Sequence, residues 1–311
     1  MPTPQYKFEP CIDFELAIGE SPVWDAERGL IWFVDVIKPA VYSFDVESGS
    51  VGTYPMPDAV GSLGLLADGR LIVALRTGLH IFEPRAGQLE FLVHPEPLMT
   101  MNRLNDGKVG PDGCFWVGSM HDSQPRMPTA SLYRITPLGD VETVLGGVKV
   151  SNGLAWSPDG QTMYHSDSRG PYVRAFDFDY QTGRTSNERV LIALDEERGL
   201  PDGAAVDVEG NYWSAGVSAG VLNRFSPDGA LIGRVALPAL APTMPCFGGH
   251  DMKTLYVTSL TAERDGIRST GTLLRANVDI AGVEICRMKA PDEFRRWASA
   301  ATANRADGHT V

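Results

Sequence analysis

The chain has 311 residues and a formal net charge of −12, with 27 Lys and Arg against 39 Asp and Glu. This balance argues against a nucleic-acid binder, which needs Lys and Arg to replace the counterions of phosphate groups, and against docking to an anionic membrane. Hydrophobic residues make up 43% of the chain, enough for a buried core, so disorder of the whole chain is excluded. Glycine and proline, with 33 and 22 residues, indicate many turns.

The cysteines and the N-terminus bear on where the protein acts. Cys11, Cys114, Cys246 and Cys286 occur singly, without the C-x-x-C spacing of a zinc site or a redox dithiol. Free thiols in a reducing compartment are the simplest interpretation. The N-terminus lacks a basic segment followed by an apolar run, and no uncharged apolar stretch is long enough to span a membrane. We therefore expect a soluble, cytoplasmic protein.

A hairpin pattern recurs along the chain. Each copy has a short apolar run, a tight turn and an aromatic-rich run, which is typical of a β-hairpin because glycine accepts the positive φ of such turns. The turn residues are Gly29, Gly69, Gly113, Gly160, Gly210 and, in a weaker sixth copy, Lys253. Successive turns are 40, 44, 47, 50 and 43 residues apart, and each unit adds a second hairpin. Four strands in about 45 residues is the period of a propeller blade.

The pattern predicts an all-β fold, a six-bladed β-propeller with four antiparallel strands per blade. We expect one propeller domain over residues 7–288 and a C-terminal tail over 289–311, with a short helix and then a frayed end. Residues 7–16 resemble a strand without a partner in the first unit. They are expected to close the ring in the last blade, beside residues 272–275 and 283–286. A β-sandwich with accidental periodicity is the alternative, and six matched hairpins disfavour it.

One register position carries polar residues in several blades. The first strand of a blade is the innermost and begins eight residues before each turn, at one mouth of the channel. The residues there are Ser21 beside Glu20, then Gly61, Asn105, Asn152, Asp202 and Pro245. Two carboxylates and two carboxamides should therefore converge. Oxygen donors without histidine or thiolate suit a hard divalent cation such as Ca²⁺, Mg²⁺ or Mn²⁺. Asn152 before glycine is alone an ordinary turn pair, but four unrelated turns need not share one axis.

Other motifs do not favour a different chemistry. The six histidines show no i, i+4 pair and no H-E-x-x-H spacing, so a zincin is not supported. His121 and His165 follow or lie on second strands, and a surface or core histidine is the better interpretation of each. The G-x-S-x-G string at residues 216–220 precedes a strand-like run, not the helix of a nucleophile elbow. No P-loop or dinucleotide fingerprint occurs.

Five ordered motifs give the chain a family resemblance. They are residues 19–24 (GESPVW), 102–108 (NRLNDGK), 151–154 (SNGL), 201–203 (PDG) and 246–249 (CFGG). In this order they closely resemble the regucalcin/gluconolactonase/luciferin-regenerating-enzyme family of six-bladed, senescence-marker-protein-like propellers. The resemblance extends to about residue 288. Residues 119–122 and 245–249 are most similar to bacterial sugar lactonases.

The resemblance implies a metal ion held by Glu20, Asn152 and Asp202, with Arg103 and Asn105 facing the substrate. The ion is one of Ca²⁺, Zn²⁺, Mn²⁺, Mg²⁺ or Fe²⁺, and the sequence does not choose among them. The sugar-contacting glutamate that regucalcin carries just after the segment matching residues 119–120 is absent, because residues 121–123 are His, Asp and Ser. Sugar identity is expected to depend on the loops at 121–128 and 261–269.

The expected function is a metal-dependent lactonase that hydrolyses an aldonolactone, such as a gluconolactone or xylonolactone, to the aldonic acid. The predicted partner is thus a small sugar lactone. Asp202 is the candidate general base, because a carboxylate at the metal can accept a proton from water. Arg103 would bind sugar hydroxyls and developing charge.

Two alternatives use the same ion. One is a phosphotriesterase-like hydrolase, against which Arg103 beside a polar mouth favours a hydroxylated substrate. The other is a non-enzymatic calcium-binding regulatory protein. A solvent-exposed ion beside Arg103 argues against it, because a structural site would be closed off by protein ligands.

Overall fold

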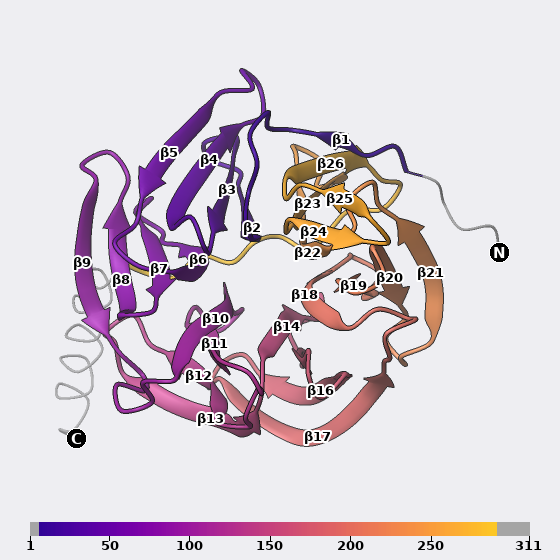
Figure 1. The fold of residues 1–311 in the computed structure, drawn as a ribbon. Helices are drawn as coiled ribbons and strands as arrows, with labels where there is room; N and C mark the ends of the chain where they lie inside the picture. The colour runs from indigo at the N-terminus through magenta and orange to yellow at the C-terminus, as the bar shows by residue number, and fades with distance from the viewer. Residues whose placement is uncertain (1–5, 291–311) are drawn as a thin grey trace, which may run out of the picture.

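Six four-stranded antiparallel sheets surround one axis in the computed structural model, which describes residues 6–290 (Figure 1). The predicted six-bladed β-propeller is confirmed. In the first five blades the strands follow one another in chain order, from the innermost outward (Figure 1). Within the described residues there is no helix, so none that could cross a membrane.

The strand bounds are as follows. The first two blades comprise β2 (Gly19–Asp25), β3 (Leu30–Asp35), β4 (Ala40–Asp45), β5 (Val51–Pro55), and β6 (Val60–Leu65), β7 (Leu71–Leu75), β8 (Gly78–Glu83), β9 (Gln88–Val93). The third and fourth comprise β10 (Asn102–Val109), β11 (Phe115–His121), β12 (Ala130–Ile135), β13 (Val141–Val148), and β14 (Ser151–Trp156), β15 (Thr162–Asp167), β16 (Tyr172–Asp179), β17 (Arg184–Ala193). The fifth and sixth comprise β18 (Pro201–Val206), β19 (Tyr212–Gly216), β20 (Val221–Phe225), β21 (Leu231–Ala236), and β22 (Pro242–Gly248), β23 (Thr254–Ser259), β26 (Leu273–Asn277), β1 (Glu9–Pro10). A small hairpin, β24 (Ala262–Arg264) and β25 (Ile267–Ser269), lies between β23 and β26.

The turn glycines have the backbone conformation that the hairpin pattern requires. All five have positive φ, from 66° at Gly29 to 87° at Gly69. In the sixth blade the positive φ falls on Met252, at 57°, one residue before the predicted Lys253. Side chains rarely adopt this conformation, which explains why the sixth copy is the weakest in the sequence.

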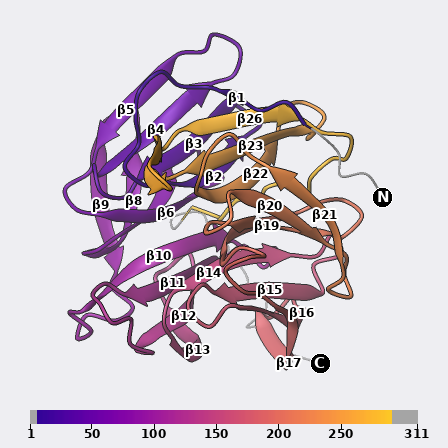
Figure 2. The ribbon, with the colours of Figure 1, turned by 45° about the vertical axis from the view of Figure 1, so that its right-hand side comes forward.

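The N-terminal strand closes the ring, as predicted. β1 is the outermost strand of the last blade and pairs with β26 in antiparallel register, Glu9 opposite Arg275 (Figure 2). It is shorter than the predicted strand over 7–16, because only Glu9–Pro10 form a ladder. Further along the segment, Leu16 makes an isolated bridge with Gly271.

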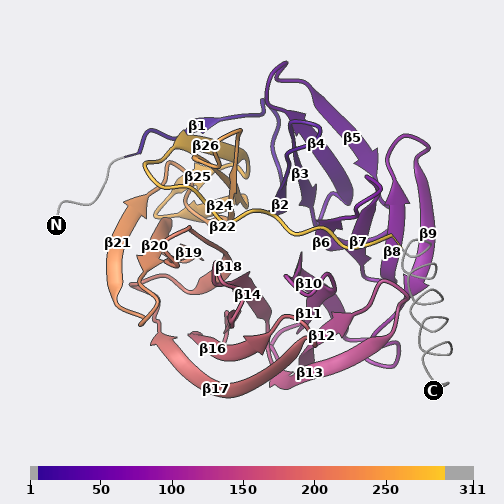
Figure 3. The same cartoon turned by 180° about the vertical axis from the view of Figure 1, so that it is seen from behind.

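The prediction for residues 283–286 is wrong. They do not join the last blade but cross the opposite end of the channel as an extended strap (Figure 3). The Val283 amide donates to the Val206 carbonyl at 3.0 Å. Met288 makes a parallel bridge with Leu66 in the second blade. Because β1 is the fourth strand of the last blade, no strand position remains there for residues 283–286. The apolar side chain of Ile285 packs instead against the core between the first and second blades and the core between the first and last blades.

Smaller predictions have mixed outcomes. All four cysteines are free thiols, as expected, although only Cys114 and Cys246 are fully buried. The predicted tail falls from residue 291 onward outside the described residues. The domain boundaries at 7 and 288 and the cytoplasmic location stay predictions.

A buried aspartate recurs in three blades. Asp25, Asp112 and Asp207 have fully buried side chains. Each accepts hydrogen bonds from an indole and a guanidinium: Trp32 and Arg287, Trp116 and Arg134, Trp213 and Arg224, respectively. The carboxylate thereby joins the first strand or first turn of its blade to later elements and satisfies polar groups that burial would otherwise leave unpaired.

Replacing Asp207 by alanine should destabilise the fold. The change removes the acceptor of the Trp213 indole and leaves the Arg224 guanidinium with only the exposed Glu209, at 3.3 Å, among the described residues. Breaking such a buried pair costs about 3–5 kcal/mol in the free energy of unfolding. Urea denaturation followed by circular dichroism measures the change. Asp228→Ala, at an exposed position in the β20–β21 turn, is the control, with an expected loss below about 1 kcal/mol. Equal losses in both variants would contradict this role.

Candidate active site

The polar register residues line one cavity of about 210 Å³. Glu20 comes from β2, Asn105 from β10, Asn152 from β14 and Asp202 from β18, so four blades contribute. Arg103, also on β10, lines the same space. Gly61 and Pro245, at the same register, are not among the lining residues. The structure therefore brings together all five residues to which the sequence assigns site roles, while their roles stay predictions.

A β-bulge at the mouth end of each inner strand aims these side chains. Pairing with the second strand shifts register in all six blades, between Glu20 and Val23, Val60 and Ser62, Leu104 and Gly107, Asn152 and Ala155, Pro201 and Ala204, and Pro242 and Met244. Bulges bend a strand and re-aim side chains, and they are common beside active sites. Gly153, with φ of 64°, supplies the left-handed residue in the fourth blade.

Glu20 and Asp202 bring two carboxylates deep into the protein without an ion-pair partner of their own among residues 6–290. Burial is the main cause that raises the pKa of Glu20 well above its usual range, and the negative charges of Asp202 and Asp106 raise it further. Burial and the charge of Asp106 raise the pKa of Asp202 to about 8. Arg103 lowers both pKa values but does not cancel the increase. The pair is a site of uncompensated negative charge.

The two carboxamides are held in different ways. Asn152 donates through Nδ2 to the Ser168 hydroxyl at 2.7 Å, and its Oδ1 lies 3.3 Å from Nδ2 of Asn105. Oδ1 of Asn105 already accepts from Nη1 of Arg103 at 2.8 Å. Each carboxamide oxygen therefore accepts one hydrogen bond, the longer one at Asn152, whose oxygen keeps a second lone pair with which it could bind a cation.

The oxygen donors of Glu20, Asn152 and Asp202, which we call the floor of the cavity, fit a hard divalent cation. Two carboxylates and a carboxamide oxygen are ligands that Ca²⁺, Mg²⁺ and Mn²⁺ prefer, and a 2+ charge would balance Glu20 and Asp202. Residues 6–290 contain no cluster of three or more His, Cys, Asp and Glu side chains able to hold a metal. A cation here would therefore rest on a mixed set that includes Asn152.

Two arginines that the sequence did not single out also line the cavity. Arg126 follows β11 and Arg169 follows β15. Both lie on loops after the second strand of a blade, which open at the same mouth as the start of the first strand. That topological rule is the signal that could have found them. His121 and His165 do not line the cavity. His165 is fully buried, and burial lowers its pKa to about 4, in agreement with a core histidine.

The model described as "SMP-30/Gluconolactonase/LRE-like region" matches residues 18–261. The chain belongs to this family. It is 36% identical over 248 residues to 6-deoxy-6-sulfogluconolactonase of Pseudomonas putida, a match that covers 79% of this chain and 84% of the relative. It is 35% identical over 260 residues to regucalcin of Xenopus laevis, covering 81% and 86%. A solved structure of luciferin-regenerating enzyme superposes with a TM-score of 0.86 at 29% identity, over 91% of this chain and 99% of that one.

The predicted family is thereby confirmed, and with it the class of enzyme, since lactone hydrolysis is the activity named among these relatives. The matched region spans Glu20, Arg103, Asn105, Asn152 and Asp202, and thus the whole floor of the cavity. The C-terminal strap lies beyond it.

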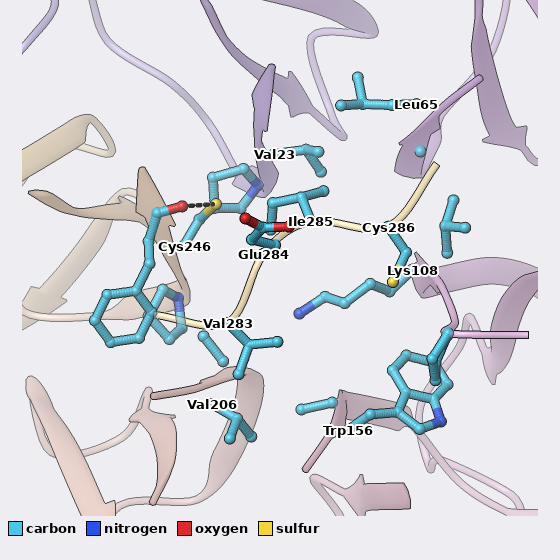
Figure 4. Close-up of a pocket in the computed structure, with 18 of the residues that line it drawn as sticks. Val23, Leu65, Lys108, Trp156, Val206, Cys246, Val283, Glu284, Ile285 and Cys286 are labelled. Carbon is cyan, nitrogen blue, oxygen red and sulfur yellow. Dashed lines mark hydrogen bonds between the residues drawn. The ribbon is translucent and has the colours of Figure 1, made fainter. Parts of the chain in front are cut away.

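A larger cavity of about 280 Å³ lies where the inner strands reach the strap (Figure 4). Its lining is mostly apolar, with Trp156 and Val206 from inner strands and Ile285 from the strap. Lys108 projects into it and donates from Nζ to the Ala204 carbonyl at 2.7 Å. Burial lowers the pKa of this amine, although the charge of Asp106 raises it. This cavity lacks the convergent oxygen donors that line the smaller one.

Binding of a cation at the floor should release protons. Because burial and the charge of Asp106 raise the pKa of Asp202 to about 8, the metal-free protein holds a proton on this carboxyl at neutral pH. A cation displaces this proton, so the apparent affinity of the cation should fall between pH 8 and pH 6, approaching about tenfold per pH unit for the proton released. Titration calorimetry with Mn²⁺ in buffers of different ionisation enthalpy counts the protons. Asp202→Asn should release fewer, and an affinity independent of pH would refute the competition.

Proposed function

We propose that this protein is a metal-dependent sugar lactonase that hydrolyses an aldonolactone to the aldonic acid. The observation that carries the proposal is the convergence of two half-buried carboxylates, the Asn152 oxygen and the Arg103 guanidinium in one cavity. Membership of a family that includes a sulfogluconolactonase supports the reaction class.

Glu20, Asn152 and Asp202 would hold the ion, one of Ca²⁺, Zn²⁺, Mn²⁺, Mg²⁺ or Fe²⁺. When bound, a divalent ion supplies Lewis-acid chemistry, polarising the lactone carbonyl and lowering the pKa of a water. These three side chains would fix the position of the ion. The two carboxylates among them, of Glu20 and Asp202, have no ion-pair partner within residues 6–290.

The residues of the chain then carry the hydrolysis. The Asp202 carboxylate accepts a proton from the attacking water while the oxygen of that water bonds to the carbonyl carbon of the lactone. Arg103 donates hydrogen bonds to the substrate and to the oxyanion that develops. As the bond between the carbonyl carbon and the ring oxygen breaks, the proton returns to that oxygen and the aldonic acid leaves. Asn105, held by Arg103, orients the sugar.

Arg103 is itself fixed for this task. Its side chain is only 10% exposed, and its Nε lies 3.3 Å from a carboxylate oxygen of Asp122. Nη1 also donates to the Leu104 carbonyl at 3.0 Å. The guanidinium therefore reaches the cavity in one orientation, which reduces the entropy lost when substrate binds.

A substrate and metal panel tests the proposal. Metal-stripped protein should hydrolyse neither glucono-1,5-lactone nor xylonolactone, and each of the five ions in turn shows which restores activity. Circular dichroism should show the fold intact throughout, because apolar cores packed between neighbouring blades hold the ring together. A phosphotriester such as paraoxon is the comparison substrate and should be hydrolysed more slowly. Full lactone turnover with no metal present would refute the metal's role. Tight ion binding without turnover of any lactone would favour a regulatory binding protein.

The substitution Asp202→Asn tests whether Asp202 is a general base as well as a metal ligand. The amide keeps an oxygen donor but cannot accept the proton, so at saturating metal kcat should fall about 10²–10⁴-fold. Arg103→Ala is the matched comparison, with metal affinity nearly unchanged and a lower kcat/KM, since its partner is the substrate. Steady-state kinetics with metal content measured on each variant gives both results. A near-wild-type kcat for saturated Asp202→Asn would mean that the proton goes elsewhere.

A further inference from the structure

The charged side chains that line the active-site cavity are unequally divided between the floor and the rim, by which we mean the loop residues Arg126 and Arg169 at the mouth. The carboxylates are Glu20 and Asp202, both of which the proposed metal site uses. The positive groups are three arginines, Arg103, Arg126 and Arg169. With a divalent ion on the floor, the cavity therefore has an excess of positive charge, in a chain whose net charge is −12.

The nearest remaining carboxylate does not neutralise these arginines. Asp122 is shared by three guanidiniums: Arg76, whose Nη2 contacts Oδ2, Arg103 at 3.3 Å and Arg126 at 3.7 Å. Nη1 of Arg126 also donates to the His121 carbonyl, which positions this side chain at the rim. Arg76 has a second carboxylate partner, Asp58 at 3.6 Å, but Arg103 and Arg126 share only Asp122 among the described residues, which leaves positive charge directed toward the cavity.

Arg169 has the least restrained guanidinium of the three. Its backbone amide donates to Asp167 at 2.9 Å, which anchors the chain at the end of β15. No hydrogen bond or ion pair to its guanidinium is found among residues 6–290. The side chain is exposed on the cavity rim, near enough to Asp202 to lower the pKa of that carboxyl.

This rim is poorly suited to a neutral sugar. Hydroxyl groups need acceptors as well as donors, but guanidinium groups only donate. The Ser168 hydroxyl already accepts from Asn152, and the floor carboxylates would face the ion. The planar guanidinium fork matches a carboxylate, sulfonate or phosphate group, to which it can make paired hydrogen bonds.

We propose that the natural lactone carries a second, anionic group at the end of the sugar away from the lactone carbonyl, and that Arg126 and Arg169 bind it. The inference rests on the proposed lactonase function and specifies its substrate class. With the carbonyl on the floor beside Arg103 and Asp202, the far end of the sugar points to the rim. The positive rim also attracts such a substrate to an otherwise acidic protein.

The experiment compares four lactones on the metal-loaded protein: glucono-1,5-lactone and its 6-phospho, 6-deoxy-6-sulfo and 6-carboxylate counterparts. At least one anionic lactone should exceed the neutral one in kcat/KM by about 10–100-fold, the effect of one or two hydrogen bonds to a charged group. This preference should shrink as ionic strength rises. The best of the three anions identifies the group.

Substitutions then assign the preference to the rim. Arg169→Ala, and separately Arg126→Lys, which keeps the charge but loses the fork, should lower the anionic-to-neutral ratio of kcat/KM, mainly through KM. Arg184→Ala removes the same charge on the outer strand β17 and should change neither substrate. If the neutral lactone is hydrolysed at least as well as every anionic one, or if Arg169→Ala leaves the ratio unchanged, the inference fails while the lactonase proposal stands. Hydrolysis of none of the four lactones would refute the proposed function itself.

Discussion

The bulge at the mouth end of each inner strand is the constraint on which the site depends. A regular strand alternates its side chains between two faces, and in a propeller both faces of the inner strand pack against neighbouring blades. The register shift frees Glu20, Asn152 and Asp202 to face the axis, after which each strand returns to regular pairing and buries apolar residues such as Val23 and Leu154. The three donors are therefore placed by three separate blades of one ring, and β1 secures that ring through long-range pairing with β26.

The geometry has an electrostatic cost. Glu20, Asp106 and Asp202 gather where burial disfavours ionisation, and burial raises the pKa of each. Asp106 is the best compensated, by the Leu154 amide at 3.2 Å and by the charge of Lys108. Among residues 6–290, Glu20 accepts a hydrogen bond only from the amide of Ser21, at 2.9 Å. This contrast agrees with a structural role for Asp106 beneath the floor and a ligand role for the other two, since neither has a cationic partner of its own from the described part of the protein.

Much of this arrangement was predictable because the turns carry a clear chemical signal. Positive φ favours glycine at five turns, and counting back eight residues places Asn105, Asn152 and Asp202 at one register, with Glu20 beside Ser21, the residue at that register in the first blade. The strap at residues 283–286 was not predictable in the same way. Its β-branched residues Val283 and Ile285, separated by Glu284, alternate as in a strand, and only the occupation of the fourth position by β1 excludes the segment from the last blade. Arg126 and Arg169 lie on loops, which have no period to count, and Asp122 pairs with Arg76 from another blade.

The floor and the rim of the cavity lie on two different kinds of backbone, inner strands and loops. The floor residues lie on inner strands whose neighbours are fully buried, so a substitution there also disturbs the packing of a blade. The rim residues Arg126 and Arg169 lie on loops after second strands, where side chains can change without altering any ladder. Under the proposed roles, reaction type is therefore tied to the fold, whereas the preference for a charged substrate depends on residues that the fold leaves free to vary.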